Sequence, residues 1–142
     1  MPELTSSPRP ALPTRPPRRT EETGPFWDGC AEGRLVLPRC TACDEFIWYP
    51  RRTCPFCGGR SVRWEQVSGD ATLYSFTIIR RGGGAYKEAA PYVVAYVELA
   101  EGPRVLTNIV VDDPFSVYIG QPVRVRFEAA GESDAIFRFE PA

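Results

Sequence analysis

The chain has 142 residues with 17 basic and 18 acidic side chains, a net charge of -1, and 43% hydrophobic residues. These values are typical of one soluble globular domain, or of a small domain with an appendage. The chain has five cysteines and no histidine. The absence of histidine excludes a Ser-His or Cys-His nucleophile within this chain and any metal site that needs imidazole.

Export and membrane signals are absent from the sequence. No run of about 18 apolar residues occurs, which argues against a transmembrane helix. The N-terminal residues lack the apolar stretch of a signal peptide, so we expect a cytoplasmic protein in which disulfides rarely persist. The pI of about 5.6 argues against non-specific binding to nucleic acid or anionic lipid, and we expect neither as a partner.

The first 20 residues are proline-rich and carry almost no large apolar side chain. Such a segment cannot bury enough surface to offset its ordering entropy, so we expect residues 1–20 to be a solvated tail or linker. The alternative is a segment that lies along a partner, since polyproline-like backbone loses little entropy on docking. Seven of the fifteen prolines lie in the first 25 residues: Pro2, Pro8, Pro10, Pro13, Pro16, Pro17 and Pro25.

A short helix with one aromatic face is predicted over about residues 21–32. Thr20 is a suitable N-cap and is followed by two glutamates, which favour the first turn of a helix. Phe26 and Trp27 lie at helical spacing from Cys30, and Gly33 offers a C-terminal stop.

Four cysteines form two C-x2-C pairs, Cys40 with Cys43 and Cys54 with Cys57, separated by ten residues. Two residues between thiolates let one chain reversal aim both sulfurs at one point, with Zn–S near ~2.3 Å. Four thiolates leave no open coordination position, so the spacing predicts a closed structural metal site. Iron of the rubredoxin type takes the same spacing, so the spacing does not separate the two metals. We favour zinc because proteins use it more often at such sites. Cys30 lies outside any paired spacing, and we predict a buried apolar thiol there.

Period-2 alternation from about residue 64 predicts five strands, at 70–80, 92–99, 104–111, 122–129 and 135–140. The sequence Glu101-Gly102-Pro103 predicts a tight turn between the second and third strands. Five short antiparallel strands favour a small closed barrel, with the five-stranded OB-fold as the leading candidate and a small sandwich as the alternative. Upstream, residues 34–37 and 46–49 are strand-like. We expect a mainly β chain divided into 1–20, 21–63 and 64–142.

A nucleic-acid-binding module is an alternative function, because ribbons and OB barrels often serve that purpose. Single-strand binding needs exposed aromatic side chains in a basic groove. Residues 64–142 carry seven basic and eleven acidic groups, and their aromatic residues follow strand alternation, so we expect most of these rings in the core. The rings are Tyr74, Phe76, Tyr92, Tyr96, Phe127, Phe137 and Phe139.

No residue is marked as catalytic, since no paired carboxylates stand at an evident catalytic spacing. Arg80, Arg81 and Lys87 flank three consecutive glycines, Gly82–Gly84. These cations form a candidate contact for an anionic ligand such as the phosphates of coenzyme A, and the alternative is a solvated loop.

The ordered motifs resemble those of the acyl-CoA-associated OB-fold proteins. The resemblance covers about residues 20–140, and one departure is Asp44, where the family usually has glycine. It implies a short helix, a rubredoxin-like zinc ribbon and a C-terminal OB barrel. It rests on Phe26-Trp27-Asp28-Gly29, Gly33-Arg34-Leu35, Cys40-x2-Cys43, Pro50-Arg51, Cys54-Pro55-x-Cys57-Gly58, Pro91 to Leu99, Gly102 and Thr107-Asn108.

The same resemblance implies a partner and a reaction. Family members form complexes with thiolases or thiolase-like lipid-transfer proteins, and some are the C-terminal part of a hydratase subunit in bacterial steroid side-chain degradation. We therefore expect a required, largely non-catalytic subunit of a two-component acyl-CoA aldolase. That aldolase cleaves a 17-hydroxy steroid C22 acyl-CoA to a 17-keto steroid and propionyl-CoA. The alternative within this class is a subunit that channels acyl-CoA between a thiolase and a synthase.

Overall fold

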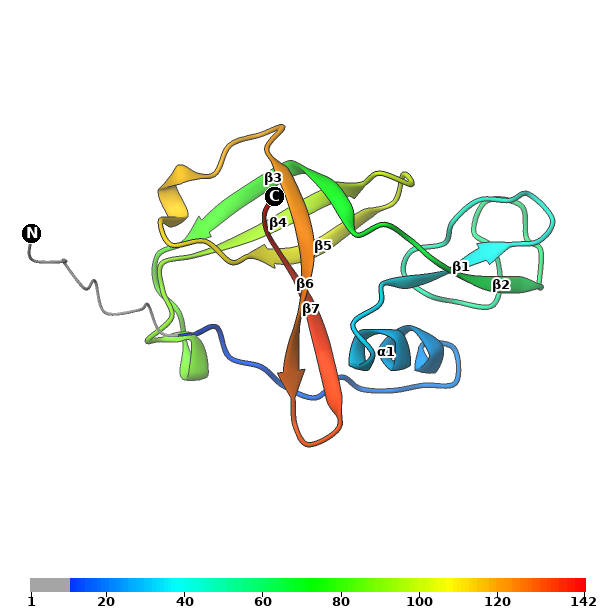
Figure 1. The fold of residues 1–142 in the computed structure, drawn as a ribbon, viewed down its shortest axis with the longest axis horizontal. Helices are drawn as coiled ribbons and strands as arrows, with labels where there is room; N and C mark the ends of the chain where they lie inside the picture. Colours follow the sequence, from blue (N-terminus) through cyan, green and yellow to red (C-terminus); the bar gives the residue numbers. More distant parts are fainter. Residues whose placement is uncertain (1–10) are drawn as a thin grey trace, which may run out of the picture.

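The computed structural model describes residues 11–142 as a helix and a two-stranded ribbon beside a closed five-stranded barrel (Figure 1). The predicted mainly β architecture is confirmed, and the sandwich alternative is wrong because β3 pairs with both β4 and β6 and closes the barrel. The elements are α1 (Gly24–Ala31), β1 (Val36–Cys40), β2 (Val62–Gln66), β3 (Asp70–Ile79), η1 (Gly84–Tyr86), β4 (Tyr92–Leu99), β5 (Arg104–Ile109), η2 (Pro114–Ser116), β6 (Pro122–Ala130) and β7 (Asp134–Pro141).

The barrel strands follow the order β3-β4-β5-β7-β6. All neighbours are antiparallel except β5 and β7, which meet in parallel at the single pair Ile109 and Phe139. Alternate side chains enter the core, as in β4, where Val93, Ala95 and Val97 are buried. The predicted turn between β4 and β5 is present, with Gly102 at a φ of 118°.

Helix α1 begins later than predicted. Thr23 is its N-cap, and Thr20 lies before it in a turn. Each threonine accepts a hydrogen bond from the backbone amide of the other. The Thr20 amide donates to Thr23 Oγ1 at 3.0 Å, and the Thr23 amide donates to Thr20 Oγ1 at 3.2 Å. The glutamates that we placed in the first helical turn therefore precede the helix. Its end is as predicted: Gly33, at a φ of 74°, donates to the carbonyl of Cys30.

The ribbon differs from the expected strand runs. Residues 46–49 do not form a strand, and Phe46 makes only an isolated bridge to Arg39. The partner of β1 is instead β2, which we did not predict and which aligns Cys40 with Val62. β2 also crosses the boundary expected between residues 63 and 64, so the ribbon's sheet extends to Gln66.

An aromatic cluster joins the helix, the ribbon and the barrel. The Phe26 ring is fully buried and lies 5.3 Å from the Trp48 ring and 5.6 Å from the Phe137 ring, measured between centroids. Trp48 belongs to the ribbon loop and Phe137 to β7. Each pair is close to edge-to-face, a geometry that favours aromatic pairs beyond their buried area. Phe26 therefore fixes the ribbon against the barrel.

The described part of the proline-rich segment, residues 11–20, has no helix or strand, and most of its residues are exposed. It passes the β6–β7 hairpin on the way to α1 (Figure 1), and Arg138 of β7 donates hydrogen bonds to the carbonyls of residues 12 and 13. The segment thus combines solvent-exposed side chains with backbone contacts to the barrel, while residues 1–10 lie outside the described residues. Among residues 11–142 no helix has the length and apolar character to cross a membrane.

Replacing Gly29 with alanine should destabilise the junction between α1 and β1. A Cβ at Gly29 would lie 2.6 Å from Val36 Cγ2 and 2.9 Å from the Arg34 carbonyl oxygen. We expect Gly29→Ala to lower the free energy of unfolding by about 1–3 kcal/mol in urea titrations. Gly24→Ala is the matched control, since a Cβ there has open space. Equal stability of the two variants would contradict the packing described.

Stability should fall at alkaline pH through Cys30. The side chain is 1% exposed, and burial raises the pKa of its thiol to about 12 from an ordinary 9.0. Because the unfolded chain loses this proton near pH 9 while the folded chain retains it, the free energy of unfolding falls between about pH 9 and 12. Between pH 8 and pH 10, the wild type should lose about 1 kcal/mol more than Cys30→Ala in urea titrations. An identical pH dependence of both proteins would show that Cys30 does not titrate in this way.

Candidate metal centre

Two matching chain reversals carry the four paired cysteines. In the first, Cys40 ends β1 and its carbonyl accepts the Asp44 amide at 2.9 Å. In the second, the carbonyl of Cys54 accepts the Gly58 amide, also at 2.9 Å. The residue after each pair has a left-handed backbone, with φ of 67° at Asp44 and 76° at Gly58. Each reversal thus turns both of its sulfurs toward the same side.

The four sulfurs converge on one point. The Sγ atoms of Cys40, Cys43, Cys54 and Cys57 all lie within 4.8 Å of one another. Two of the distances, Cys40 to Cys57 and Cys43 to Cys54, are 3.6 Å. A tetrahedron with Zn–S bonds of ~2.3 Å has sulfurs about 3.8 Å apart, so the cluster fits a four-coordinate ion. The predicted ligand set is brought together by the fold, and it leaves no coordination position for substrate.

Backbone amides complete the surroundings of the sulfurs. Phe56 N donates to Cys54 Sγ and Gly59 N donates to Cys57 Sγ, each at 3.4 Å. Burial and contacts among the thiols raise the pKa values of Cys43 and Cys57, whereas hydrogen bonds from backbone amides, chiefly that of Cys43, lower the pKa of Cys40 to about 7. Such donors favour the thiolate that a metal requires. A Cβ at Gly59 would lie 3.2 Å from Cys40 Sγ and 3.3 Å from Cys57 Sγ, so glycine keeps the backbone close to the sulfurs.

Asp44 departs from the glycine usual in the resembled family, yet the turn is preserved. Aspartate is among the few non-glycine residues that adopt a left-handed backbone. Its carboxylate pairs with Arg63 at 2.5 Å and with Arg39 at 3.1 Å. Both arginines lower the pKa of Asp44, and Arg63 has the larger effect. Glu65 of β2 pairs with the same two arginines. Asp44 therefore ties the first chain reversal to both ribbon strands.

The three candidate anion contacts lie on the loop between β3 and β4, and all three are exposed. Arg80 follows β3 directly, and its guanidinium lies 4.8 Å from the centroid of the Phe115 ring in η2. Arg81 follows it in the chain, and Lys87 follows η1. The loop thus presents positive charge to solvent.

Two aromatic residues expected in the core lie on the outside of the barrel. Tyr74 is 47% exposed and Tyr96 is 46% exposed. Tyr74 continues the outward positions of β3, after Asp70 and Thr72, and the register shifts between Leu73 and Ser75. The Arg104 guanidinium lies 3.9 Å from the centroid of the Tyr74 ring. The other five rings are buried or partly buried, as expected for most of them.

Sequence reasoning did not identify Arg138 as a special residue. It has the outward position of an ordinary strand arginine, but it is 3% exposed. Nothing in the local pattern signals this burial, because the covering atoms belong to residues 12 and 13.

Removing one thiolate should abolish metal binding. Metal binding contributes about 10 kcal/mol or more to the folding of small zinc modules, so Cys54→Ala should lose the ion and unfold the ribbon. Cys30→Ala, which removes the unpaired cysteine, should keep it. Elemental analysis by mass spectrometry should find one zinc per chain in the wild type and in Cys30→Ala, and none in Cys54→Ala. Iron in the wild-type protein would contradict the choice of zinc, and full metal content in Cys54→Ala would contradict the ligand set.

Comparison with protein families assigns both parts of the chain. Residues 27–63 match the family described as "ChsH2, rubredoxin-like zinc ribbon domain", and residues 64–128 match "ChsH2, C-terminal OB-fold domain". A "DUF35 domain-containing scaffold protein" of Methanothermobacter thermautotrophicus is 36% identical over 75% of this chain and 86% of its own length.

Two hydratase subunits match over only part of their lengths. The "Probable enoyl-CoA hydratase alpha subunit" of Thermomonospora curvata is 35% identical over 90% of this chain, which spans 40% of that protein. The "3-oxo-4,17-pregnadiene-20-carboxyl-CoA hydratase alpha subunit" of Mycobacterium tuberculosis is 32% identical over 78% of this chain and 35% of its own length.

A solved structure supports the same relationship. A chain of the "Ltp2-ChsH2(DUF35) aldolase" superposes with a TM-score of 0.78 and 30% identity, over 88% of this chain and 98% of that one. The agreement covers the helix, the four-cysteine ribbon and the barrel together. The chain therefore belongs to the DUF35 family of ChsH2-type proteins, which join a rubredoxin-like zinc ribbon to an OB-fold domain.

Proposed function

We propose that this chain is a largely non-catalytic subunit that assembles with a thiolase-like protein to form an acyl-CoA aldolase. The observation that carries the proposal is the likeness to the Ltp2-ChsH2(DUF35) aldolase, because this chain covers 98% of the matched chain. A match over 88% of this chain includes the ribbon as well as the barrel, so the likeness extends to both modules.

The chemistry of the chain favours a largely non-catalytic role in the complex. The chain has no histidine to act as a general base. The four clustered thiolates would fill the coordination sphere of a zinc ion, which then supplies structure and not Lewis acidity. Burial keeps the remaining thiol, Cys30, protonated. We therefore propose that the catalytic acid and base sit mainly on the thiolase-like partner.

The reaction we propose is the retro-aldol cleavage of a 17-hydroxy steroid C22 acyl-CoA. The bond between the carbinol carbon and the α-carbon of the thioester breaks, and the hydroxyl proton passes to a base of the partner. The electron pair of the broken bond forms an enolate of the thioester, which takes up a proton. The products are a 17-keto steroid and propionyl-CoA. The name of the mycobacterial hydratase subunit, which is a steroid acyl-CoA enzyme, supports this substrate class.

In the complex, we propose that Arg80, Arg81 and Lys87 approach the phosphates of coenzyme A. Their exposure on the β3–β4 loop supports this role, because multivalent phosphates are recognised by clustered, accessible cations. The sugar-phosphate part of the ligand is remote from the bond that breaks. These residues would therefore affect binding of the acyl-CoA more than the cleavage step.

A second candidate is a scaffold that channels acyl-CoA between a thiolase and a synthase without an aldol step. The support for it is the archaeal relative named a scaffold protein, which matches over 86% of its length. The two candidates share the thiolase-like partner and the acyl-CoA, and they differ in the products.

Product analysis of the assembled complex should distinguish the two candidates. We expect this chain to co-purify with a thiolase-like protein and the pair to release propionyl-CoA and a 17-keto steroid, with neither protein active alone. Cys54→Ala should lose both assembly and activity, whereas Cys30→Ala should retain them. Replacing Arg80, Arg81 and Lys87 with alanine should raise KM and leave kcat nearly unchanged. Acetyl-CoA formed from a 3-oxoacyl-CoA, with no retro-aldol product, would favour the scaffold.

A further inference from the structure

A charged side chain is buried on the outside of the barrel. Arg138 lies between Phe137 and Phe139 on β7, and Phe139 is fully buried in the core. Successive side chains of a strand point to opposite faces, so Arg138 points out of the barrel. An outward arginine is normally solvated, but this side chain is only 4% exposed. Its partners include residues 12 and 13, which begin the segment 12–19 that we call the strap.

Arg138 binds the strap through backbone carbonyls. Its Nη2 donates to the Pro13 oxygen at 2.6 Å, and its Nη1 donates to the Leu12 oxygen at 3.4 Å. The Glu128 carboxylate pairs with the same guanidinium, and Asn108 Oδ1 accepts from Nε at 3.2 Å. A polyproline-type chain makes no internal hydrogen bonds and leaves its carbonyls free for such donors. The guanidinium is thus fixed by the barrel and directed at the strap.

The strap contacts recur every three residues. After Pro13, Pro16 packs so closely on the β6–β7 turn that a Cβ at Gly131 would lie 2.8 Å from Pro16 Cγ. Arg19 then donates to Asp134 from Nε at 2.9 Å and from Nη2 at 2.6 Å, and it pairs with Asp28 of α1 at 2.6 Å. This spacing equals the three-residue repeat of a polyproline II helix.

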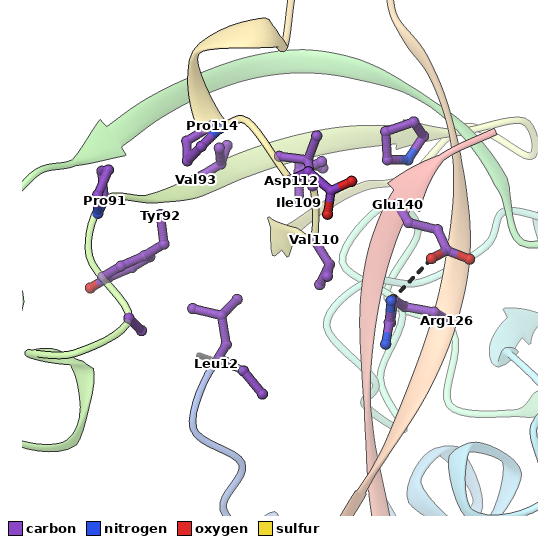
Figure 2. Close-up of a pocket in the computed structure, with 14 residues that line it drawn as sticks. Leu12, Pro91, Tyr92, Val93, Ile109, Val110, Asp112, Pro114, Arg126 and Glu140 are labelled. Carbon is purple, nitrogen blue, oxygen red and sulfur yellow. Dashed lines mark hydrogen bonds and ion pairs between the residues drawn. The ribbon is translucent and has the colours of Figure 1, made fainter. Parts of the chain in front are cut away.

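The N-terminal end of the strap meets a cavity of about 420 Å³. Leu12 lines it together with Tyr92 and Val110, as Figure 2 shows. The other walls come from the start of β4 and the ends of β5 and β7, and they combine apolar side chains with the ion pair of Arg126 and Glu140. An apolar side chain is the residue type that gains from burial in such a hollow. Leu12 therefore anchors the segment whose carbonyls Arg138 binds.

We propose that the outer face of the β6–β7 hairpin is a binding site for an extended proline-rich peptide, with the strap as its occupant in this chain. The pattern it selects is Leu-Pro-x-x-Pro-x-x-Arg. The cavity accepts the leucine, and Arg138 binds the adjacent carbonyls. Gly131 contacts the second proline, and Asp134 pairs with the arginine. The attached segment has an effective concentration in the millimolar range for a short linker, so it outcompetes a free peptide of the same pattern. The site is thus a reversible clasp for residues 12–19.

Trypsin digestion of the full-length protein tests docking of the strap within the chain. Trypsin does not cut before proline, so the bonds after Arg18 and Arg19 are its sites in the strap. We expect cleavage there to be at least tenfold slower than in a free peptide of residues 10–20. Arg138→Gln and Leu12→Ser should each accelerate cleavage several-fold, because the first alters the barrel side of the contact and the second alters the strap side. Arg124→Gln is the matched control, because Arg124 is 66% exposed on the same hairpin and pairs with Asp70.

Cleavage of the wild type as fast as the free peptide, or of Arg138→Gln no faster than Arg124→Gln, would overturn the proposal. Zinc content and thermal melting establish that each variant is folded. If Arg138→Gln fails to fold, Leu12→Ser still tests the proposal, because it alters only the strap.

A binding experiment tests recognition of the peptide pattern. In a full-length variant with Leu12, Pro13, Pro16 and Arg19 all replaced by serine, the site is released from its own strap. A fluorescein-labelled peptide of residues 10–20 should bind this variant at least tenfold more tightly than the wild type, measured by anisotropy. Adding Arg138→Gln should weaken binding at least tenfold, and adding Arg124→Gln should not. Equal binding to the wild type and the released variant would refute a peptide site.

Discussion

The ring of Phe26 touches the three parts of the molecule at once. It projects from α1, meets Trp48 of the ribbon and Phe137 of the barrel, and has no exposed surface. Trp48 also meets Phe137 directly, at 5.9 Å between ring centroids, and Leu35 and Leu37 share one buried cluster with the barrel core. Without this junction around Phe26 the ribbon would be connected to the barrel mainly by the chain between β2 and β3. A tethered ribbon would present changing surfaces to a partner. With it, a surface that spans both modules has a single shape.

The metal centre and the aromatic junction depend on each other. Trp48 lies in the loop between the two C-x2-C pairs, so the four thiolates define the ends of the loop that carries it. Beside it, Ile47 is fully buried against Cys40 and Cys54, which connects the ligands to the loop through packing. Loss of the ion would release the loop and withdraw Trp48 from Phe26. A structural metal can therefore affect the assembly of the whole subunit.

Much of this structure could be predicted from the sequence, because the decisive signals are local. The C-x2-C spacing identifies the four ligands, and alternation locates the barrel strands almost to their ends. The incorrect predictions concern elements whose structure depends on contacts outside the local sequence pattern. The strand at 62–66 forms because β1 offers it an edge, and the helix begins at Thr23 because Thr20 and Thr23 bond to each other. The burial of Arg138 depends on residues more than a hundred positions away, which no local pattern encodes.

The account rests on the ribbon and barrel being one rigid body, and residual dipolar couplings measure this directly. Backbone amide couplings of the full-length zinc-loaded protein would be collected separately for residues 36–66 and 70–141. We expect one alignment tensor to fit both sets in the wild type, and two tensors to be needed in Phe26→Ala. Two different tensors in the wild type would show that the modules move independently, and would contradict the account.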